Sequence, residues 1–416
     1  MSRVAIIGSG VSGLTAAYAL RNTHAVTLFE QDGRFGGHAH THALTDASGA
    51  PQHVDSGFIV HNERTYPNLL RIFAELGVET QETEMSMSIR CDECGLAYAG
   101  GRGRKGIFAQ PRRLFDPRFL RMLIEVPCFH RAARAALATG SNRTWGEFLQ
   151  DGRYSAYFVH HFAVPLVSCV WSSGDEDTLR YPARHLFAFL EHHGLLSIGN
   201  SPTWRTVVGG SRSYVEAITR LLPDVRMNSA VVAVHRHEDC VDVSLADGTS
   251  EHFDQVIIAT HADSALALLA DATDAERAAL SAIPYSRNAT WLHGDMSPLP
   301  LEPGARASWN YRMDRCDGGA ENVLVTYWMN HLMRLDSRDQ YLVTLNAAGR
   351  IDESQVIARM DYSHPVFTHD AVAAAAVLRE SGGPRLAFAG AHLGWGFHED
   401  GARSGIEAAR KFGAQW

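Results

Sequence analysis

Long apolar runs are missing from this chain of 416 residues. A helix that spans a membrane needs about 18 consecutive apolar residues, and no segment of the sequence comes near that length. The apolar run at the start, Val4–Ile7, is too short for the core of a signal peptide and leads directly into a glycine motif. We therefore expect a cytoplasmic protein that does not cross a membrane.

A basic excess is missing as well, because 38 Lys and Arg residues stand against 46 Asp and Glu residues and the formal net charge is −8. Proteins that bind nucleic acids concentrate positive charge on one surface, so we expect no nucleic-acid partner. Lysine itself is nearly absent, since only Lys105 and Lys411 occur.

Cysteine is sparse, with six residues in the chain, and only Cys91 and Cys94 form a CxxC pair. A zinc site that is visible in a sequence normally shows a second such pair, or histidines at ligand spacing. We therefore predict no metal site and interpret the pair as two partly buried thiols in a hairpin. A redox dithiol is the alternative that stays open.

What is present at the N-terminus is the pattern of a βαβ unit. The apolar run Val4–Ile7 predicts a buried strand, the Ala-rich segment Ser12–Leu20 predicts a helix, and Val26–Phe29 predicts a second strand. Residues 8–13, which read Gly-Ser-Gly-Val-Ser-Gly, form a GxGxxG motif between the first strand and the helix.

This motif has the chemistry of a dinucleotide site. Gly8 permits a tight turn, Gly10 lets the backbone approach a pyrophosphate, and Gly13 lets helix and strand pack closely. The helix N-terminus offers free N–H groups and a positive dipole end to the phosphates. Glu30 ends the second strand, where a carboxylate binds a ribose hydroxyl.

Further elements follow along the chain. The stretch 108–196 is predicted to be mostly helical, interrupted by Pro111, Pro117, Pro127 and Pro165. Asp247-Gly248 predicts a hairpin turn between strands expected at Val241–Leu245 and Val256–Ala259. The other expected elements are strands at Ala230–Val234, Val241–Leu245, Val256–Ala259, Val323–Trp328, Tyr341–Leu345 and Leu386–Ala389, and helices at Ala262–Leu269, 370–380 and Ala402–Phe412.

Rossmann-like pieces thus occur at the start, near 200–265 and at the end of the chain. We predict interleaved domains, with a dinucleotide-binding domain at 1–66, 198–265 and 383–416. The segments 67–197 and 266–382 would then form a substrate-binding domain.

Residues 34–38, which read Arg-Phe-Gly-Gly-His, follow Glu30 closely. An acidic strand end followed by Arg-x-Gly-Gly resembles the flavin-containing amine oxidase superfamily, which includes protoporphyrinogen oxidases and carotenoid desaturases. Val54–Gly57 resembles the strand that brings the chain under the isoalloxazine. Residues 388–409 resemble the closing motif, in which a helix N-terminus points at the pyrimidine carbonyls of the flavin and would stabilise its reduced form.

The resemblance implies an α/β fold in which a Rossmann-type FAD-binding domain, of the amine oxidase and glutathione reductase type, is interleaved with an α+β substrate domain of antiparallel sheet and helices. It implies FAD as cofactor, and we expect noncovalent binding because no Cys or His lies in an attachment motif. The residues that it assigns to the cofactor are Gly8, Gly10, Val11, Ser12, Gly13, Glu30, Gln31, Gly36, Gly37, His38, Asp55, Ser56, Gly57, Val232, Thr260, Gly390, Gly401 and Ala402.

Three longer stretches, 54–68, 204–211 and 395–401, narrow the resemblance. They look like the FAD-dependent oxidoreductases that accompany cyclopropane-fatty-acid-synthase-like methyltransferases. This resemblance implies a fatty acyl or phospholipid acyl substrate that is unsaturated or methylated, its desaturation as the reaction, and a methyltransferase as a partner.

Amine oxidases often keep a lysine near the reactive nitrogen of the flavin, and neither lysine of this chain lies in a segment suited to that role. Hydride abstraction from carbon is therefore favoured over amine oxidation. Such a reaction needs a base, for which His398, Glu399 and Asp400 are the candidates because they directly precede Gly401. Capping of the closing helix is the competing role for Asp400. His38 and His261 are further histidines expected near the flavin.

Three alternatives stay open beside a desaturase: a flavin-dependent isomerase that moves a double bond, an amine oxidase, and a non-catalytic flavoprotein partner of a lipid methyltransferase. The stretch 102–124 mixes Arg and Lys with large apolar residues. That mixture suits docking on the inner face of an anionic membrane, and it equally suits a helix that packs on the core with its arginines in solvent.

Overall fold

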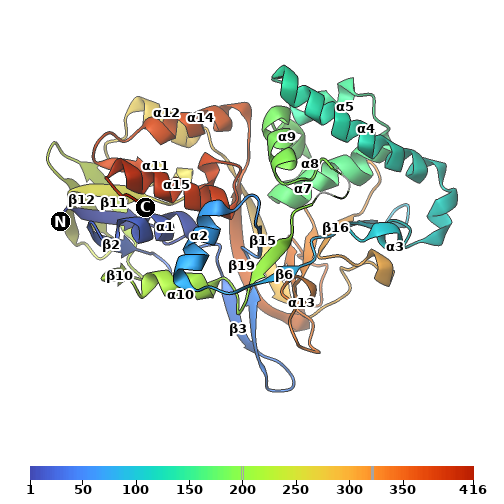
Figure 1. Ribbon diagram of the computed structural model, residues 1–416, viewed down its shortest axis with the longest axis horizontal. Coiled ribbons are helices and arrows are strands. Elements are labelled where there is room, and N and C mark those ends of the chain that lie inside the picture. The colour runs from blue at the N-terminus through green and yellow to red at the C-terminus, as the bar shows by residue number, and fades with distance from the viewer. Residues whose placement is uncertain (198, 200, 320–322) are drawn as a thin grey trace.

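Three distant segments of the chain build one parallel sheet, which lies in the left lobe of Figure 1 together with both termini. The structure is a computed structural model that describes residues 1–197, 199, 201–319 and 323–416. Every neighbouring pair in this sheet is parallel. The strand order is β10 (Asp224–Arg226), β2 (Ala25–Phe29), β1 (Arg3–Ile7), β14 (Gln255–Ile258) and β20 (Leu386–Phe388).

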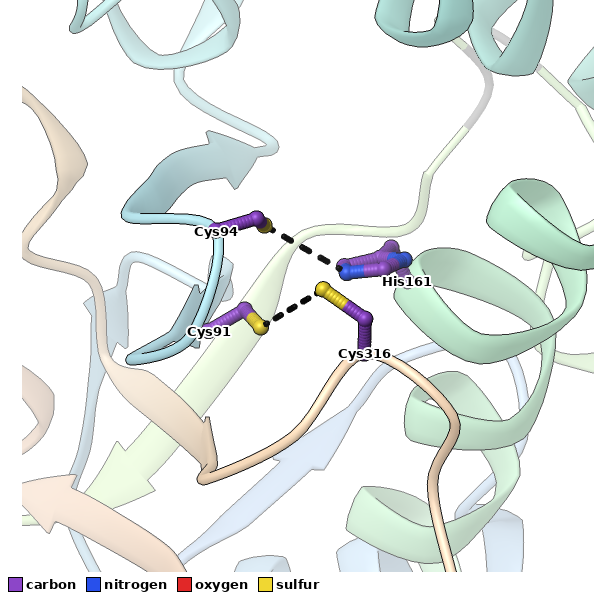
Figure 2. Close-up of side chains that lie close together, drawn as sticks. All are labelled: Cys91, Cys94, His161 and Cys316. Atoms are coloured by element: carbon purple, nitrogen blue, oxygen red, sulfur yellow. Dashed lines mark hydrogen bonds between the residues drawn. The ribbon is translucent and has the colours of Figure 1, made fainter.

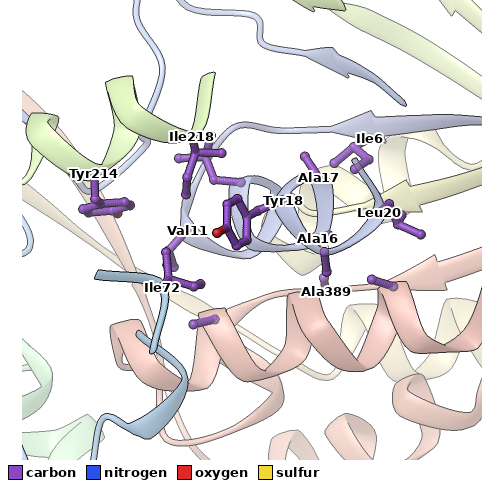
Figure 3. Packing of buried hydrophobic residues seen from close by; sticks show 14 of the residues in the cluster. Ile6, Val11, Ala16, Ala17, Tyr18, Leu20, Ile72, Tyr214, Ile218 and Ala389 are labelled. Atoms are coloured by element: carbon purple, nitrogen blue, oxygen red, sulfur yellow. The ribbon is translucent and has the colours of Figure 1, made fainter. Parts of the chain in front are cut away.

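Two helices pack tightly against each other beside this sheet. They are α1 (Val11–Leu20), whose ten residues are all buried, and α15 (His398–Lys411). A Cβ on Gly405 would lie 2.2 Å from the carbonyl oxygen of Ser12, so only glycine allows this approach. Figure 3 shows the resulting core, in which side chains of α1 meet those of α2 (Pro67–Leu76) and α10 (Arg212–Thr219).

The other face of the parallel sheet is covered by α11 (Ala262–Leu268), α12 (Asp274–Ser281) and α14 (His369–Glu380). A small antiparallel sheet joins the same core, with the order β11 (Val231–Arg236), β12 (Val241–Leu245) and β13 (Ser250–Phe253).

The prediction that the strands at Val241–Leu245 and Val256–Ala259 form a hairpin is wrong. The turn at Asp247-Gly248 leads into β13, whereas β14 pairs in parallel with β1. β13 reads Ser-Glu-His-Phe and buries only Phe253, so it has no apolar pattern that the sequence could reveal.

A seven-stranded sheet forms the floor of the second lobe, and its strands come from both halves of the chain. β15 and β19 pair along their whole lengths, and β7 pairs in parallel with β16. The order is β19 (Val356–Pro365), β15 (Tyr285–His293), β18 (Leu342–Leu345), β17 (Val325–Trp328), β16 (Trp309–Met313), β7 (Met87–Cys91) and β8 (Leu96–Gly100).

The helical stretch lies at the upper right of Figure 1. Its core is aromatic, with Phe119, Phe129, Trp145, Phe158 and Phe187 fully buried. The helices are α3 (Gly103–Ile107), η1 (Pro111–Phe115), α4 (Pro117–Thr139), α5 (Trp145–Asp151), α6 (Ala156–Phe158), the π-helical turn η2 (Val159–Ala163), α7 (Val164–Trp171), α8 (Asp175–Arg180) and α9 (Ala183–His192).

The prediction of a mostly helical stretch is confirmed, but one expected interruption is not. Pro111, Pro117 and Pro165 lie in first turns, where the missing N–H costs nothing. Pro127 lies inside α4, which continues through it.

Smaller strands connect the two lobes. The hairpin of β3 (Thr41–Thr45) and β4 (Pro51–Asp55) projects at the bottom of Figure 1, and β9 (Trp204–Val207) pairs between β5 (Val60–Asn62) and β6 (Thr80–Thr83). α2 packs into the core of α1, although it follows the boundary expected at residue 66. The division into domains stays a prediction. Among the described residues, no helix has the length and apolar character needed to span a membrane.

Candidate functional site

The turn between β1 and α1 leaves open space over a helix N-terminus. Gly8 has φ +97°, and a Cβ there would lie 2.8 Å from the carbonyl oxygen of Ala259, so the turn requires glycine. A Cβ added to Gly10 would meet nothing within 4 Å. The first N–H groups of a helix have no partner within the helix, so this space can take an anionic group.

Glu30 is fixed beside this turn. Its buried carboxylate accepts hydrogen bonds from the backbone N–H and the hydroxyl of Ser9, at 3.0 and 2.5 Å, and from the backbone N–H of Asp32 at 3.0 Å. Ser9 also accepts a hydrogen bond from the N–H of Gly36. Ser9 therefore joins the strand end to the Arg-x-Gly-Gly loop, a role that the x position of GxGxxG does not reveal.

That loop lies against the glycine turn. Gly37 has φ +56°, and a Cβ on it would lie 3.1 Å from the Cα of Gly10. The Nη1 atom of Arg34 is buried and has no hydrogen-bond partner among the described residues. A guanidinium nitrogen without a protein partner, in the loop that lies against the glycine turn, suits the pyrophosphate of a dinucleotide.

Two residues at the strand ends of this lobe fit the same ligand. The register of β11 against β12 shifts between Val231 and Ala233, which makes Val232 the extra residue of a β-bulge. A bulged residue is left out of the ladder, so its backbone can contact a ligand. Thr260 follows β14 and packs against Gly8.

Residues 55–57 support the loop of Gly36 and Gly37. Asp55 is buried and accepts hydrogen bonds from Thr41 and from the N–H and hydroxyl of Ser211, and burial raises its pKa to about 6. A Cβ on Gly57 would lie 2.1 Å from the carbonyl oxygen of His38. Because of this approach, Phe58 donates its N–H to the same carbonyl.

A cluster of histidines and tyrosines extends from this loop to the seven-stranded sheet. The ring of His38 lies 4.9 Å from that of Tyr362, 5.5 Å from that of His364 and 6.0 Å from that of His261. Tyr285 stacks on His261 at 4.5 Å. We call these five residues the histidine–tyrosine cluster.

The histidines of this cluster are neutral at neutral pH. Burial lowers the pKa of His364 to about 4, and it lowers the pKa of His38 well below its ordinary value. Burial also lowers the pKa of His261. The Nε2 atom of His38 is buried and has no hydrogen-bond partner among the described residues. Such a nitrogen is free to accept a proton or a hydrogen bond from a ligand.

A cavity of about 800 Å³ adjoins the cluster and is lined by His261 and Tyr285. Charged residues also line it, among them Asp263, Arg287 and Asp361.

The three candidate bases lie in the first turn of α15, which begins four residues earlier than expected. The Nε2 atom of His398 lies 2.7 Å from the hydroxyl of Tyr214, its ring stacks on Phe58 at 3.7 Å, and burial lowers its pKa to about 3. Glu399 accepts hydrogen bonds from the N–H groups of Asn68 and Leu69, at the N-terminus of α2.

Asp400 accepts a hydrogen bond from the N–H of Phe397 and pairs with Arg403 at 2.9 Å, while burial raises its pKa to about 6. Glu399 and Asp400 therefore cap helices, and His398 holds Tyr214. The assignment of the base among these residues stays a prediction.

The remaining predicted cofactor residues of the C-terminal segment hold α15 in place. Gly390 leaves no room for a side chain, since a Cβ there would lie 2.2 Å from the ring of His392. The N–H of Gly390 donates a hydrogen bond to the hydroxyl of Ser404. A Cβ on Gly401 would lie 2.5 Å from the side chain of Val11, and the carbonyl of Ala402 accepts a hydrogen bond from Thr15. The N-termini of α1 and α15 are thus brought together.

A model of the family described as flavin containing amine oxidoreductase matches residues 11–411. The chain belongs to this family. Its cofactor is therefore FAD, and the prediction of an FAD-dependent oxidoreductase is confirmed. The glycine turn, the unpartnered Nη1 of Arg34 and the bulge at Val232 fit the nucleotide part of this cofactor.

Solved structures share the fold of this family member over nearly the whole chain. Cyclohexylamine oxidase from Brevibacterium oxydans IH-35A is 14% identical, with a TM-score of 0.71, over 99% of this chain and 98% of that chain. A CLA-producing fatty acid isomerase from P. acnes is 16% identical, with a TM-score of 0.72, over 99% of both chains. A putrescine oxidase bound to putrescine is 15% identical, with a TM-score of 0.70, over 98% of both chains. No curated protein matches the sequence.

Sequence reasoning did not identify Ser9, Arg34, Tyr285, Tyr362 and His364 as site residues. Arg34 lies within the Arg-x-Gly-Gly motif, where its charge beside two glycines offers a signal. The other four carry none, because a lone serine, tyrosine or histidine in a strand or turn is usually a structural residue.

Proposed function

We propose that the protein oxidises carbon, removing a hydride from an unsaturated or methylated fatty acyl chain to give a further double bond. The observation that carries this proposal is the histidine–tyrosine cluster, whose rings are half-buried or buried and uncharged at neutral pH. An apolar acyl chain meets no charge at these rings, and the charged residues Asp263, Arg287 and Asp361 line the adjoining cavity.

The positions of the two lysines support oxidation at carbon. Lys105 lies on α3, which belongs to the helical stretch of the second lobe. Lys411 ends α15, and its ammonium group donates to the carbonyl oxygens of Arg379 and Ser381. Neither lysine can hold a water molecule beside the histidine–tyrosine cluster.

The reaction divides into two transfers. The flavin supplies the hydride acceptor when it is bound. Removal of a hydride beside a double bond leaves an allylic cation on the substrate, and loss of a proton from the next carbon then gives a diene. His38 is well suited to take this proton because its Nε2 is unpartnered, and burial keeps it neutral. His398 is the second candidate, although its Nε2 already faces Tyr214.

Lipid profiling tests the proposal. The protein is expressed in a bacterial host with and without a cyclopropane-fatty-acid-synthase-like methyltransferase, which is the proposed partner. We expect fatty acids that are two hydrogens lighter in the presence of active enzyme. The Gly10→Ala variant, designed to exclude the cofactor, serves as control, and an unchanged fatty acid profile in both hosts would contradict the proposal.

A flavin-dependent double-bond isomerase is the second candidate. In this reaction the hydride taken from one carbon would return from the flavin to another carbon of the allylic cation, so that no electron acceptor is consumed, and the fatty acid isomerase from P. acnes shares the fold. The electron acceptor separates the two reactions: a desaturase stops after one turnover without oxygen or a quinone, whereas an isomerase continues and its product keeps the mass of the substrate.

We also propose that the protein reaches its substrate at an anionic lipid surface. Phe115 is 86% exposed and Ile124 is 68% exposed, and Arg118 and Arg121 lie on the exposed surface of α4 between them. Large apolar side chains among arginines bind the boundary between headgroups and acyl chains.

Vesicle sedimentation tests this contact with the Phe115→Ser and Ile124→Ser double variant. We expect binding to vesicles of phosphatidylglycerol to fall at least tenfold, with flavin content unchanged. Val377→Ser is the control, since Val377 is an exposed apolar residue of α14. Equal binding by the double variant and the control would refute a membrane contact at this surface.

A further inference from the structure

Four potential metal ligands meet in the second lobe, away from the flavin site (Figure 2). Cys91 ends β7 and Cys94 lies in the turn to β8, while His161 comes from η2 and Cys316 from the loop after β16. Their ligand atoms all lie within 4.8 Å of one another.

Two of the six distances between these atoms match the edges of a tetrahedron. The sulfurs of Cys91 and Cys316 are 3.6 Å apart, and the sulfur of Cys94 is 3.7 Å from Nε2 of His161. In a tetrahedral zinc site, with Zn–S bonds of about 2.3 Å and Zn–N bonds of about 2.0 Å, neighbouring ligand atoms lie about 3.5 to 3.8 Å apart. A disulfide would need about 2.05 Å between two sulfurs.

The histidine is oriented as a ligand. Its Nδ1 lies 3.1 Å from the carbonyl oxygen of Tyr157, which accepts a hydrogen bond from Nδ1–H and leaves Nε2 unprotonated toward the sulfurs. The ring also stacks on Tyr157 at 4.2 Å. A metal-bound histidine typically has its other ring nitrogen held by such an oxygen. The single π-helical turn of η2 is a feature that is frequent at functional sites.

The backbone around the sulfurs is also arranged to suit metal-bound thiolates. The N–H groups of Cys94 and Leu96 donate toward the sulfurs of Cys91 and Cys94. The carboxylate of Glu93 accepts a hydrogen bond from the N–H of Cys316, which fixes the third cysteine against the turn. Cys91 and His161 are almost fully buried.

We propose that Cys91, Cys94, His161 and Cys316 bind one Zn²⁺ ion through three thiolates and one imidazole. Four protein ligands leave no open position, so the ion has a structural role. It joins the β7–β8 hairpin to the helical stretch and to the loop after β16. These three segments of the second lobe are distant in the sequence. The metal is independent of the flavin and of the proposed reaction.

Metal analysis of the purified full-length flavoprotein tests this site. We expect about one zinc per chain in the wild type, and at least a fivefold lower zinc content in Cys94→Ser and in Cys316→Ser. Cys128→Ser is the matched control, because Cys128 is an exposed cysteine of α4, and it should keep its zinc. Bound flavin reports that each variant is folded.

A second measurement does not depend on any variant folding. The wild type is stripped with a chelator and titrated with Co²⁺ alone. We expect absorption bands of tetrahedral cobalt–thiolate at wavelengths longer than those of the flavin, and a lower unfolding temperature of the stripped protein that Zn²⁺ restores. A wild type without zinc, iron in place of zinc, a Cys91–Cys316 disulfide, or Co²⁺ binding without thiolate bands would each overturn the assignment.

Discussion

Gly10 is a residue at which the protein itself tolerates a side chain, whereas we expect the cofactor not to tolerate one. A Cβ there meets no protein atom within 4 Å, and its φ of −63° is open to any residue. Gly37 differs, because a Cβ on it would approach Gly10 at 3.1 Å and its φ is positive. Substitution of Gly10 therefore separates ligand binding from folding, which substitution of Gly37 does not.

We expect Gly10→Ala to lower FAD affinity at least tenfold, because the added methyl group occupies the space of the pyrophosphate. The unfolding temperature of the FAD-free protein should stay the same. Titration with FAD and thermal unfolding of the stripped proteins measure the two effects. Unchanged FAD affinity in this variant would show that the pyrophosphate does not bind at the glycine turn.

His38 and His398 are distinguished by their partners. We expect His38→Gln to slow flavin reduction by an acyl substrate about 100-fold or more while FAD remains bound, since a general base contributes about 10² to 10⁴ in rate. His398→Gln keeps a polar group beside Tyr214 and should change the rate much less. Stopped-flow absorbance measures both. A large loss in His398→Gln with a normal His38→Gln would make His398 the base.

At the scale of elements, the first turn of α15 caps the N-terminus of a neighbouring helix as well as its own. Glu399 lies in the first turn of α15 and accepts hydrogen bonds from the first residues of α2, Asn68 and Leu69. Glu399, which the sequence suggests as one of three candidate bases, thus also serves a junction between two helices. Local spacing could not reveal this role, because α2 lies more than 300 residues earlier in the chain.

We expect Glu399→Ala to lower the free energy of unfolding by about 1–3 kcal/mol, since buried N–H groups lose a charged acceptor. The rate of flavin reduction should change little. Glu407→Ala on the exposed side of α15 is the control and should be near neutral. Denaturant unfolding and stopped-flow absorbance give the two readouts. A stable Glu399→Ala protein whose flavin is no longer reduced by substrate would indicate that Glu399 is the base.

Elements with a strong local pattern could be predicted from the sequence, including β1, α1, β2 and most of the helical stretch. Their apolar residues recur with a clear period, and the glycines of the turn have fixed functions. β13 could not be predicted, because three of its four residues are polar. The pairing of β14 with β1 depends on contacts 251 residues apart, which no local pattern contains.

The same limit explains the cysteines. Cys91 and Cys94 are close in sequence, but His161 and Cys316 join them only through the fold. The predicted absence of a metal site rested on sequence neighbours alone, and the proposed zinc site revises it. By contrast, FAD as the cofactor could be predicted, because the glycine motifs are each local and occur in the family's chain order.

For the whole molecule, the many buried histidines determine how stability depends on pH. Burial lowers the pKa of eight of them to about 3 or 4, below the ordinary value of about 6.5 that each regains on unfolding. The unfolded chain therefore binds more protons than the folded chain between these values. These histidines are His40, His61, His185, His193, His293, His364, His392 and His398.

Asp55 and Asp400 act in the opposite direction, because burial raises their pKa to about 6 and the folded state then holds their protons more tightly. The eight histidines outnumber them. We expect the free energy of unfolding to fall steeply as the pH drops from about 6.5 to about 5, at up to about 1.4 kcal/mol per pH unit for each net proton. Denaturant unfolding over this range measures it, and constant or rising stability toward acid would contradict the account.

Anaerobic reduction of the bound flavin tests the central claim most directly. The oxidised flavoprotein is mixed without oxygen with unsaturated fatty acids and phospholipids, and separately with primary amines, while the flavin absorbance is followed. We predict bleaching by an acyl lipid, formation of a product two hydrogens lighter, and no bleaching by amines. A flavin that amines bleach and acyl lipids leave oxidised would show that the protein oxidises amines and not carbon.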